Sequence, residues 1–207
     1  IPDDLDDIKA CFSPGVDEIS EFEEDCFNKG MEIFLADKSV DRPKLTKINF
    51  SFIKKFIGTY NDKDFITLDQ WFKDSKVDEN EDIILQMDIE GAEYNSIINA
   101  SDNFLNRSRI IVIEFHDLDK LWQPDFYSLA DEVFKKILKN HTCVHIHPNN
   151  HSGSLIKNGI EIPRIAEFTF LRNDRIKETS FKIKFPHKLD RDNTQKETLI
   201  LPKIWWS

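Results

Sequence analysis

The stretch Ile83-Ile-Leu-Gln-Met-Asp-Ile-Glu-Gly-Ala-Glu93 decides the fold. Its first half is a short apolar run interrupted only by Gln86, which is typical of a strand buried on both faces of a sheet. Its second half crowds three carboxylates and a glycine into the junction between that strand and a following helix. The stretch therefore predicts a strand over 83–87 that carries Asp88 and Glu90 at its carboxyl end.

Arg109-Ile-Ile-Val-Ile-Glu-Phe115 predicts the clearest strand of the chain, and it ends at His116. Because side chains alternate along a strand, Glu114 and His116 fall on the same face, opposite Phe115. A glutamate inside an apolar run is costly to bury unless it is paired or used. Both strands are thus expected to carry polar groups at their carboxyl ends, where open α/β sheets bind ligands.

The rest of the chain alternates between apolar runs and amphipathic stretches, which is the pattern of βαβ units around a mostly parallel sheet. Further strands are expected over 8–12, 31–36, 47–53, 65–68, 142–147 and 166–171, the last two as an antiparallel edge. Helices are expected over 19–29, 94–105 and after Pro124, a short helix and a loop over 69–82, and a polar loop over 148–159. A length of 207 residues indicates a single domain, with a core of about 8–172 and a C-terminal extension over 173–207 that packs on the body.

Composition excludes several classes of protein. A formal net charge of -10 disfavours nucleic acid as a partner, since phosphate contacts need a positive field. The six glycines form neither G-x-G-x-x-G nor G-x-x-x-x-G-K-[ST], and no G-x-S-x-G is present. Three scattered cysteines, an acidic start and the lack of a long apolar run predict a cytoplasmic protein without a disulfide framework or a membrane span.

Two further strand ends carry candidate site residues. The first turn holds Ser13 and Gly15, and the second strand ends at Asp37. A carboxylate at that point is suited to a ribose diol, although Asp37 could equally cap a helix or a turn. His145 and His147 share a strand face. They could ligate zinc, bind substrate or simply be polar side chains on the surface.

Several of these segments together resemble the FkbM family of S-adenosylmethionine-dependent methyltransferases. The strongest is Asp88-Ile-Glu-Gly-Ala-Glu93, and the likeness extends from about Cys11 to Phe170. It includes the segments at 12–16, 22–23, 66–72, 111–116, 145–150 and 167–170. The chain departs from the family in its first turn, which has no glycine-rich acidic motif, and at Gln86, where lysine is common.

The resemblance implies a class I methyltransferase fold, a Rossmann-like, mostly parallel seven-stranded sheet with helices on both faces and an antiparallel last strand. It also implies O-methylation, often of sugars in glycans or glycosylated metabolites. Carried onto this chain, it places Gly15, with Ser13 in the same turn, at the methionine part of S-adenosylmethionine and Asp37 at its ribose. Asp88 would lie near the reacting centre. Asp64 and Thr67 would border the adenine.

Methyl transfer to a hydroxyl requires that the acceptor lose a proton, to a general base or with the help of a metal ion. A group of four residues could hold Mg²⁺ or Mn²⁺, namely Asp88, Glu90, Glu114 and His116. Alternatively His116 or His147 is the base without a metal, and His116 is favoured because it lies on the expected catalytic edge.

Two other functions remain open from the sequence. A metal-dependent hydrolase could use the same carboxylates and histidines, and would bind metal tightly and ignore S-adenosylmethionine. A catalytically inactive domain of the same fold could bind a glycan through Trp71, Trp122 and the polar segment His147-Pro-Asn-Asn-His151. The acceptor is expected to be a small molecule or a carbohydrate, and the sequence does not fix the oligomeric state.

Overall fold

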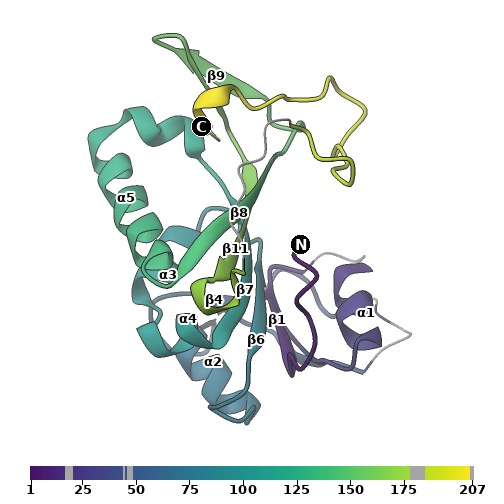
Figure 1. The fold of residues 1–207 in the computed structure, drawn as a ribbon. Helices are drawn as coiled ribbons and strands as arrows, with labels where there is room; N and C mark the ends of the chain where they lie inside the picture. Colours follow the sequence, from purple (N-terminus) through teal and green to yellow (C-terminus); the bar gives the residue numbers. More distant parts are fainter. Residues whose placement is uncertain (17–20, 44, 46–48, 178–184, 206–207) are drawn as a thin grey trace.

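In a computed structural model the protein is built around one seven-stranded sheet (Figure 1), and the structure describes residues 1–16, 21–43, 45, 49–177 and 185–205. The strands in chain order are β1 (Ala10–Pro14), β2 (Glu32–Ala36), β3 (Ser51–Ile53), β6 (Ile83–Met87), β7 (Ser108–Phe115), β8 (His141–Pro148) and β11 (Ala166–Arg172). Their order across the sheet is β3-β2-β1-β6-β7-β11-β8. Every neighbouring pair is parallel except those made by β11, which runs antiparallel to both β7 and β8. The expected mostly parallel sheet with an antiparallel last strand is confirmed.

Helices cover both faces of the sheet. Figure 1 shows α1 (Glu21–Asn28) on one side, and α2 (Leu68–Ser75), α3 (Glu93–Asn99), α4 (Asp102–Arg107) and α5 (Pro124–Leu138) on the other. The two faces bury separate cores, because alternate residues of each strand point to opposite sides. Phe12 packs against Phe34 and Trp71 under the larger helical layer, whereas Cys11 belongs to the core under α1. Trp71 is 3% exposed, so it is a core residue and not a platform for a glycan.

The helix expected over 94–105 is instead two helices, α3 and α4, separated at Ala100 and Ser101. Ser101 caps α4, since its hydroxyl accepts a hydrogen bond from Phe104 N. Asp69 of α2 holds this cap by accepting from Ser101 N at 2.8 Å. The break therefore follows from a contact between residues 32 positions apart, which helical periodicity does not reveal.

The expected polar loop over 148–159 was also wrong in part. It contains β9 (Ser154–Lys157), which pairs with β10 (Ile160–Pro163) as an antiparallel hairpin. Asn158 and Gly159 form its two-residue turn, both with positive φ, the combination that the tight hairpin turn demands. This hairpin follows the carboxyl end of β8.

The remaining predictions need smaller adjustments. The expected strand over 8–12 lies two residues later, and that over 47–53 is reduced to β3, with 46–48 outside the described residues. The short strand near Phe65 is β5 (Phe65–Ile66), which pairs with β4 (Phe56–Ile57) in a separate ladder. Residues 19 and 20 of the helix expected over 19–29 also lie outside the described part. Three short 3-10 turns complete the fold at η1 (Leu118–Trp122), η2 (Asn173–Arg175) and η3 (Lys203–Trp205).

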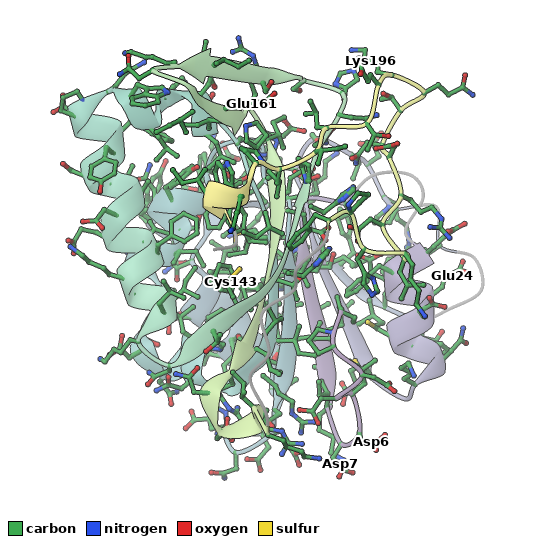
Figure 2. The ribbon with its side chains drawn as sticks, turned by 45° about the horizontal axis from the view of Figure 1, so that its top comes forward. Asp6, Asp7, Glu24, Cys143, Glu161 and Lys196 are labelled. Atoms are coloured by element: carbon green, nitrogen blue, oxygen red, sulfur yellow. The ribbon has the colours of Figure 1, made fainter. Side chains whose placement is uncertain are left out.

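The described part of the C-terminal extension contacts the outer strand β8 and the hairpin. Asp190 lies 2.9 Å from His145 Nε2, and Thr194 N donates to Asn150 Oδ1. Trp205 Nε1 donates to the carbonyl of Glu161 on β10. Figure 2 shows Glu161 and Lys196 toward one end of the molecule and Asp6 and Asp7 at the other. These contacts join the described part of the extension to the edge of the sheet and to the hairpin.

Among the described residues, no helix combines the length and the apolar character that crossing a lipid bilayer requires.

Candidate functional site

The turn after β1 packs directly against the carboxyl end of β6. Gly15 has φ +82°, and a β-carbon at this position would lie 1.4 Å from the carbonyl oxygen of Asp88. Asp88 N donates to Pro14 O at 3.2 Å, and Gly15 N donates to Ala36 O at 3.0 Å. Only glycine fits here, and its absent side chain brings the ends of β1, β2 and β6 together.

Asp37 links two of these turns. Its Oδ2 accepts from Val16 N at 3.2 Å, and its Oδ1 accepts from Ser39 N and Ser39 Oγ, each at 2.6 Å. The carboxylate thus holds the turn after β1 against the turn after β2. Asp37 lies at the carboxyl edge of the sheet as expected, and it also has the turn-stabilising role that was its alternative.

The residues expected near the adenine divide into two cases. Asp64 lies beside the end of β2, because Lys38 Nζ contacts Asp64 Oδ1 at 2.5 Å. Thr67 is the N-cap of α2, where its hydroxyl accepts from Gln70 N and its own N–H donates to Asn61 Oδ1. Asp64 is therefore within reach of the side chain that follows Asp37, whereas Thr67 already has a structural task.

Ser13 lies in the interior between α1 and the sheet. Its Oγ is 2.5 Å from Glu23 Oε1 and 2.6 Å from Gln86 Oε1, and Ser13 is fully buried. This network explains how a polar Gln86 is accommodated inside a buried strand. The structure does not bring the Ser13 side chain to the carboxyl edge.

A cluster of carboxylates around His116 forms the chemical centre of that edge. His116 Nε2 lies 3.8 Å from Asp88 Oδ1, 3.7 Å from Glu114 Oε2 and 3.5 Å from Glu90 Oε2. One ligand atom from each of Asp88, Glu114 and His116 lies within 4.8 Å of the other two. The register of the sheet explains this, because Met87 on β6 pairs with Ile113 on β7, so Asp88 and Glu114 follow side by side.

Glu93 is a central residue of the cluster that the sequence analysis did not single out. It is fully buried, and its Oε1 accepts from Ile89 N and Gly91 N, both at 3.1 Å. The same oxygen lies 3.1 Å from His116 Nδ1. A carboxylate oxygen already accepting two N–H groups accepts from Nδ1 as well, so Nδ1 carries a hydrogen and Nε2 faces the other carboxylates. In the sequence, the position of Glu93 at the end of Asp88-Ile-Glu-Gly-Ala-Glu93 could have indicated that it belongs to the cluster.

The crowding of like charges changes how the cluster titrates. Burial and then the charge of Glu114 raise the pKa of Asp88 to about 7, with smaller contributions from Glu90 and Glu93. Burial alone would lower the pKa of His116, but the hydrogen bond to Glu93 and the surrounding carboxylates raise it to about 9. In this arrangement His116 is protonated at neutral pH and Asp88 is near its midpoint.

Two other expected residues, Glu90 and His147, lie at the rim of the cluster around His116 or outside it. The Glu90 side chain is 86% exposed, so it sits at the rim of the cluster. His147 is on β8, separated from β7 by β11, and its Nε2 lies 2.8 Å from the carbonyl oxygen of Arg191 in the extension. The structure therefore joins Asp88, Glu114 and His116, with Glu90 beside them, and leaves His147 outside.

The geometry can now be set beside known proteins. The family model for the methyltransferase FkbM domain matches residues 13–145, from the turn after β1 to the middle of β8. The chain belongs to the FkbM methyltransferase family. The match includes every residue of the carboxyl-edge cluster. Neither the curated proteins nor the solved structures contain a significant match.

Proposed function

We propose that this FkbM-family protein transfers a methyl group from S-adenosylmethionine to a sugar hydroxyl of a glycan or a glycosylated metabolite. The observation that carries the proposal is the convergence of Gly15, Asp37 and Asp88 at one edge of a parallel sheet. In open α/β sheets this edge is where cofactors bind.

The residues at this edge suit the donor. The tight turn at Gly15 lets backbone approach the methionine part, and the Asp37 carboxylate keeps lone pairs for the ribose diol beside the N–H groups it already accepts. Asp64, which forms an ion pair with Lys38, would border the adenine. The cofactor supplies an electrophilic methyl group on a cationic sulfur, and the carboxylates of the cluster provide a favourable field for that charge.

Asp88 is the better placed of the expected proton acceptors. A general base works best with a pKa near the working pH, which is the condition of Asp88, whereas His116 already holds its proton. His116, fixed by Glu93, would orient and balance the Asp88 carboxylate. Help from a divalent cation at the same carboxylates is the alternative route for releasing the hydroxyl proton.

The charge of the cluster also favours a neutral acceptor. Asp88, Glu90, Glu93 and Glu114 surround one imidazole, so the edge is strongly negative. Phosphorylated or carboxylated acceptors would be repelled, while uncharged sugar hydroxyls can hydrogen-bond to carboxylates. This field and the overall charge of -10 both argue against nucleic acid.

The proposal can be tested with methyl-labelled S-adenosylmethionine and a panel of neutral glycosides. We expect label to enter at least one glycoside, and transfer to be lost in Asp88→Asn but kept in Asp125→Asn, a matched change at an exposed site on α5. Failure of the protein to bind the donor would contradict the proposal. Transfer to a nitrogen acceptor only would contradict its assignment to hydroxyl groups.

A further inference from the structure

We propose that Asp88, Glu114 and His116 form a site for one divalent cation, Mn²⁺ or Mg²⁺, between the carboxyl ends of β6 and β7. The inference rests on the proposed function only for what the cation does, because the binding site itself is argued from geometry and charge. It gives the metal-assisted route of the proposed transfer a defined set of ligands.

The spacing of the three ligand atoms fits a shared cation. His116 Nε2 is 3.8 Å from Asp88 Oδ1 and 3.7 Å from Glu114 Oε2. Around an octahedral Mg²⁺ with bonds of about 2.1 Å, ligand atoms are separated by about 3.0 Å when adjacent and about 4.2 Å when opposite. The observed separations fall between these values and are too long for direct hydrogen bonds.

A buried oxygen of Asp88 has no hydrogen bond to any described residue, and the free ring nitrogen of the buried His116 faces the same point. Within the described part of the chain, Asp88 Oδ1 is buried and has no hydrogen-bond partner. His116 is 8% exposed, and its Nδ1–H is taken by Glu93, which leaves Nε2 directed at the carboxylates of Asp88 and Glu114. An unpaired buried polar atom is costly, and a cation at the shared point would satisfy both at once.

Glu93 provides the second layer that metal-binding histidines usually have. A ligating imidazole almost always donates its other ring N–H to a carboxylate or a carbonyl, which fixes the tautomer and the ring orientation. Glu93 Oε1 does this for His116 while it also accepts from Ile89 N and Gly91 N. Glu93 is therefore a positioning residue, fully buried and one step removed from the cation.

The net negative charge of the carboxylate cluster requires more than one positive charge to balance it. Four carboxylates, those of Asp88, Glu90, Glu93 and Glu114, surround a single imidazole, so the cluster keeps an excess of negative charge whether or not His116 is protonated. Of the lysines and arginines in the described ranges, none forms an ion pair with any of the four. The sulfonium of the donor offsets one charge, and a divalent cation offsets two more.

The ligand set points to the class of cation. Two carboxylates and one imidazole suit Mn²⁺, and predominantly oxygen ligands suit Mg²⁺. Three protein ligands leave positions open, and a cation there supplies Lewis acidity toward an acceptor hydroxyl. The rim residue Glu90 is within 3.5 Å of His116 Nε2 and could approach the same point from the solvent side.

The test is a titration of the full chain with Mn²⁺ after chelator treatment. Binding is monitored by electron paramagnetic resonance, as the loss of the signal of free Mn²⁺. We expect one site in the wild type and at least tenfold weaker binding in Glu114→Gln and His116→Gln. Glu79→Gln and His151→Gln change the same residue types at exposed positions and should bind as the wild type does. Glu93→Gln should weaken binding about 10–100-fold through the ring orientation.

Parallel titrations with S-adenosylhomocysteine separate this inference from the proposed function. If the homocysteine product binds and Mn²⁺ does not, the cation site is wrong and the methyltransferase proposal stands. If Mn²⁺ binds and S-adenosylhomocysteine does not, the cation site stands and the methyltransferase proposal is wrong. Unchanged Mn²⁺ binding in Glu114→Gln, with thermal unfolding showing a folded variant, would also overturn the site, as would tight Zn²⁺ binding with no response to Mn²⁺.

Discussion

The two ends of strands β6 and β7 carry charge clusters of opposite character. At the amino end, Asp82 is bound by Arg109 Nε at 2.8 Å and by Arg172 Nη1 at 2.6 Å, and Asp4 is bound by Arg175 in the same way. At the carboxyl end, four carboxylates share one histidine. The charges at the amino end are paired and hydrogen-bonded, which is what stability requires of buried charge. The carboxyl end keeps a large excess of negative charge.

The buried histidines at the two ends show the same contrast. His141 at the amino end of β8 is 2% exposed, and its Nε2 lies 2.7 Å from the carbonyl oxygen of Ser108. Burial lowers the pKa of His141, and the charge of Arg172 acts in the same direction. His116 at the carboxyl end has its pKa raised instead. The excess of negative charge costs stability and is found at the carboxyl end alone of these two clusters, which supports the proposal that this end carries the function.

The largest expected effect is on methyl transfer in Asp88→Ala. Removing the carboxylate that accepts the proton in one route and holds the cation in the other should lower turnover by about 10²–10⁴-fold. The free energy of unfolding should not fall, because the change relieves repulsion from Glu114 and Glu90. Turnover and urea denaturation, measured on the same preparation, check both parts. Wild-type turnover in this variant would remove Asp88 from the active site.

At the amino end, the corresponding change should act on stability alone. Asp82→Asn leaves Arg109 and Arg172 without their shared carboxylate, and Arg109 is 5% exposed. We expect a loss of about 2–3 kcal/mol in the free energy of unfolding, somewhat below the value for a fully buried pair. Product binding measured well below the denaturation midpoint should be unchanged. A stable variant that no longer binds the product would erase the contrast between the two ends.

One contribution to the pH dependence of stability should come from His141. Its pKa in the folded protein lies below the value of about 6.5 that the unfolded chain has, so its contribution is fully present above pH 6.5 and is lost as the pH falls through that value. Asp88 and His116, whose pKa values are raised, change stability in the opposite direction over this range, so the test compares the wild type with His141→Gln, which keeps an N–H donor for Ser108. Between pH 7.5 and pH 5.5 the urea midpoint should change less favourably in the wild type than in His141→Gln. Equal changes in the two proteins would show that His141 does not contribute to this dependence.

The smallest effect is expected for Glu90→Gln. Its side chain is 86% exposed at the rim of the cluster, where solvent screens its charge. Turnover should fall less than tenfold, and the thermal midpoint should hardly move. A loss as large as that of Asp88→Ala would place Glu90 among the groups that contact the reacting atoms.

The sequence predicted the strands that carry the site because each is a continuous apolar run with a polar end. The interruption at Ser101 escaped prediction because it depends on Asp69, far away in the chain. The hairpin was missed although Asn158 and Gly159 are its turn signal, since the strands beside them are short and polar. The role of Glu93 depends on a tertiary contact with His116, and no spacing in the sequence specifies it.

The central claim is that the carboxyl edge binds S-adenosylmethionine, and isothermal titration with S-adenosylhomocysteine tests it most directly. The account predicts one site per chain, at least tenfold weaker binding in Asp37→Asn, and no change in Asp41→Asn, an exposed aspartate further along the same loop. Absence of binding in the folded wild-type protein, or equal affinity in both variants, would contradict it.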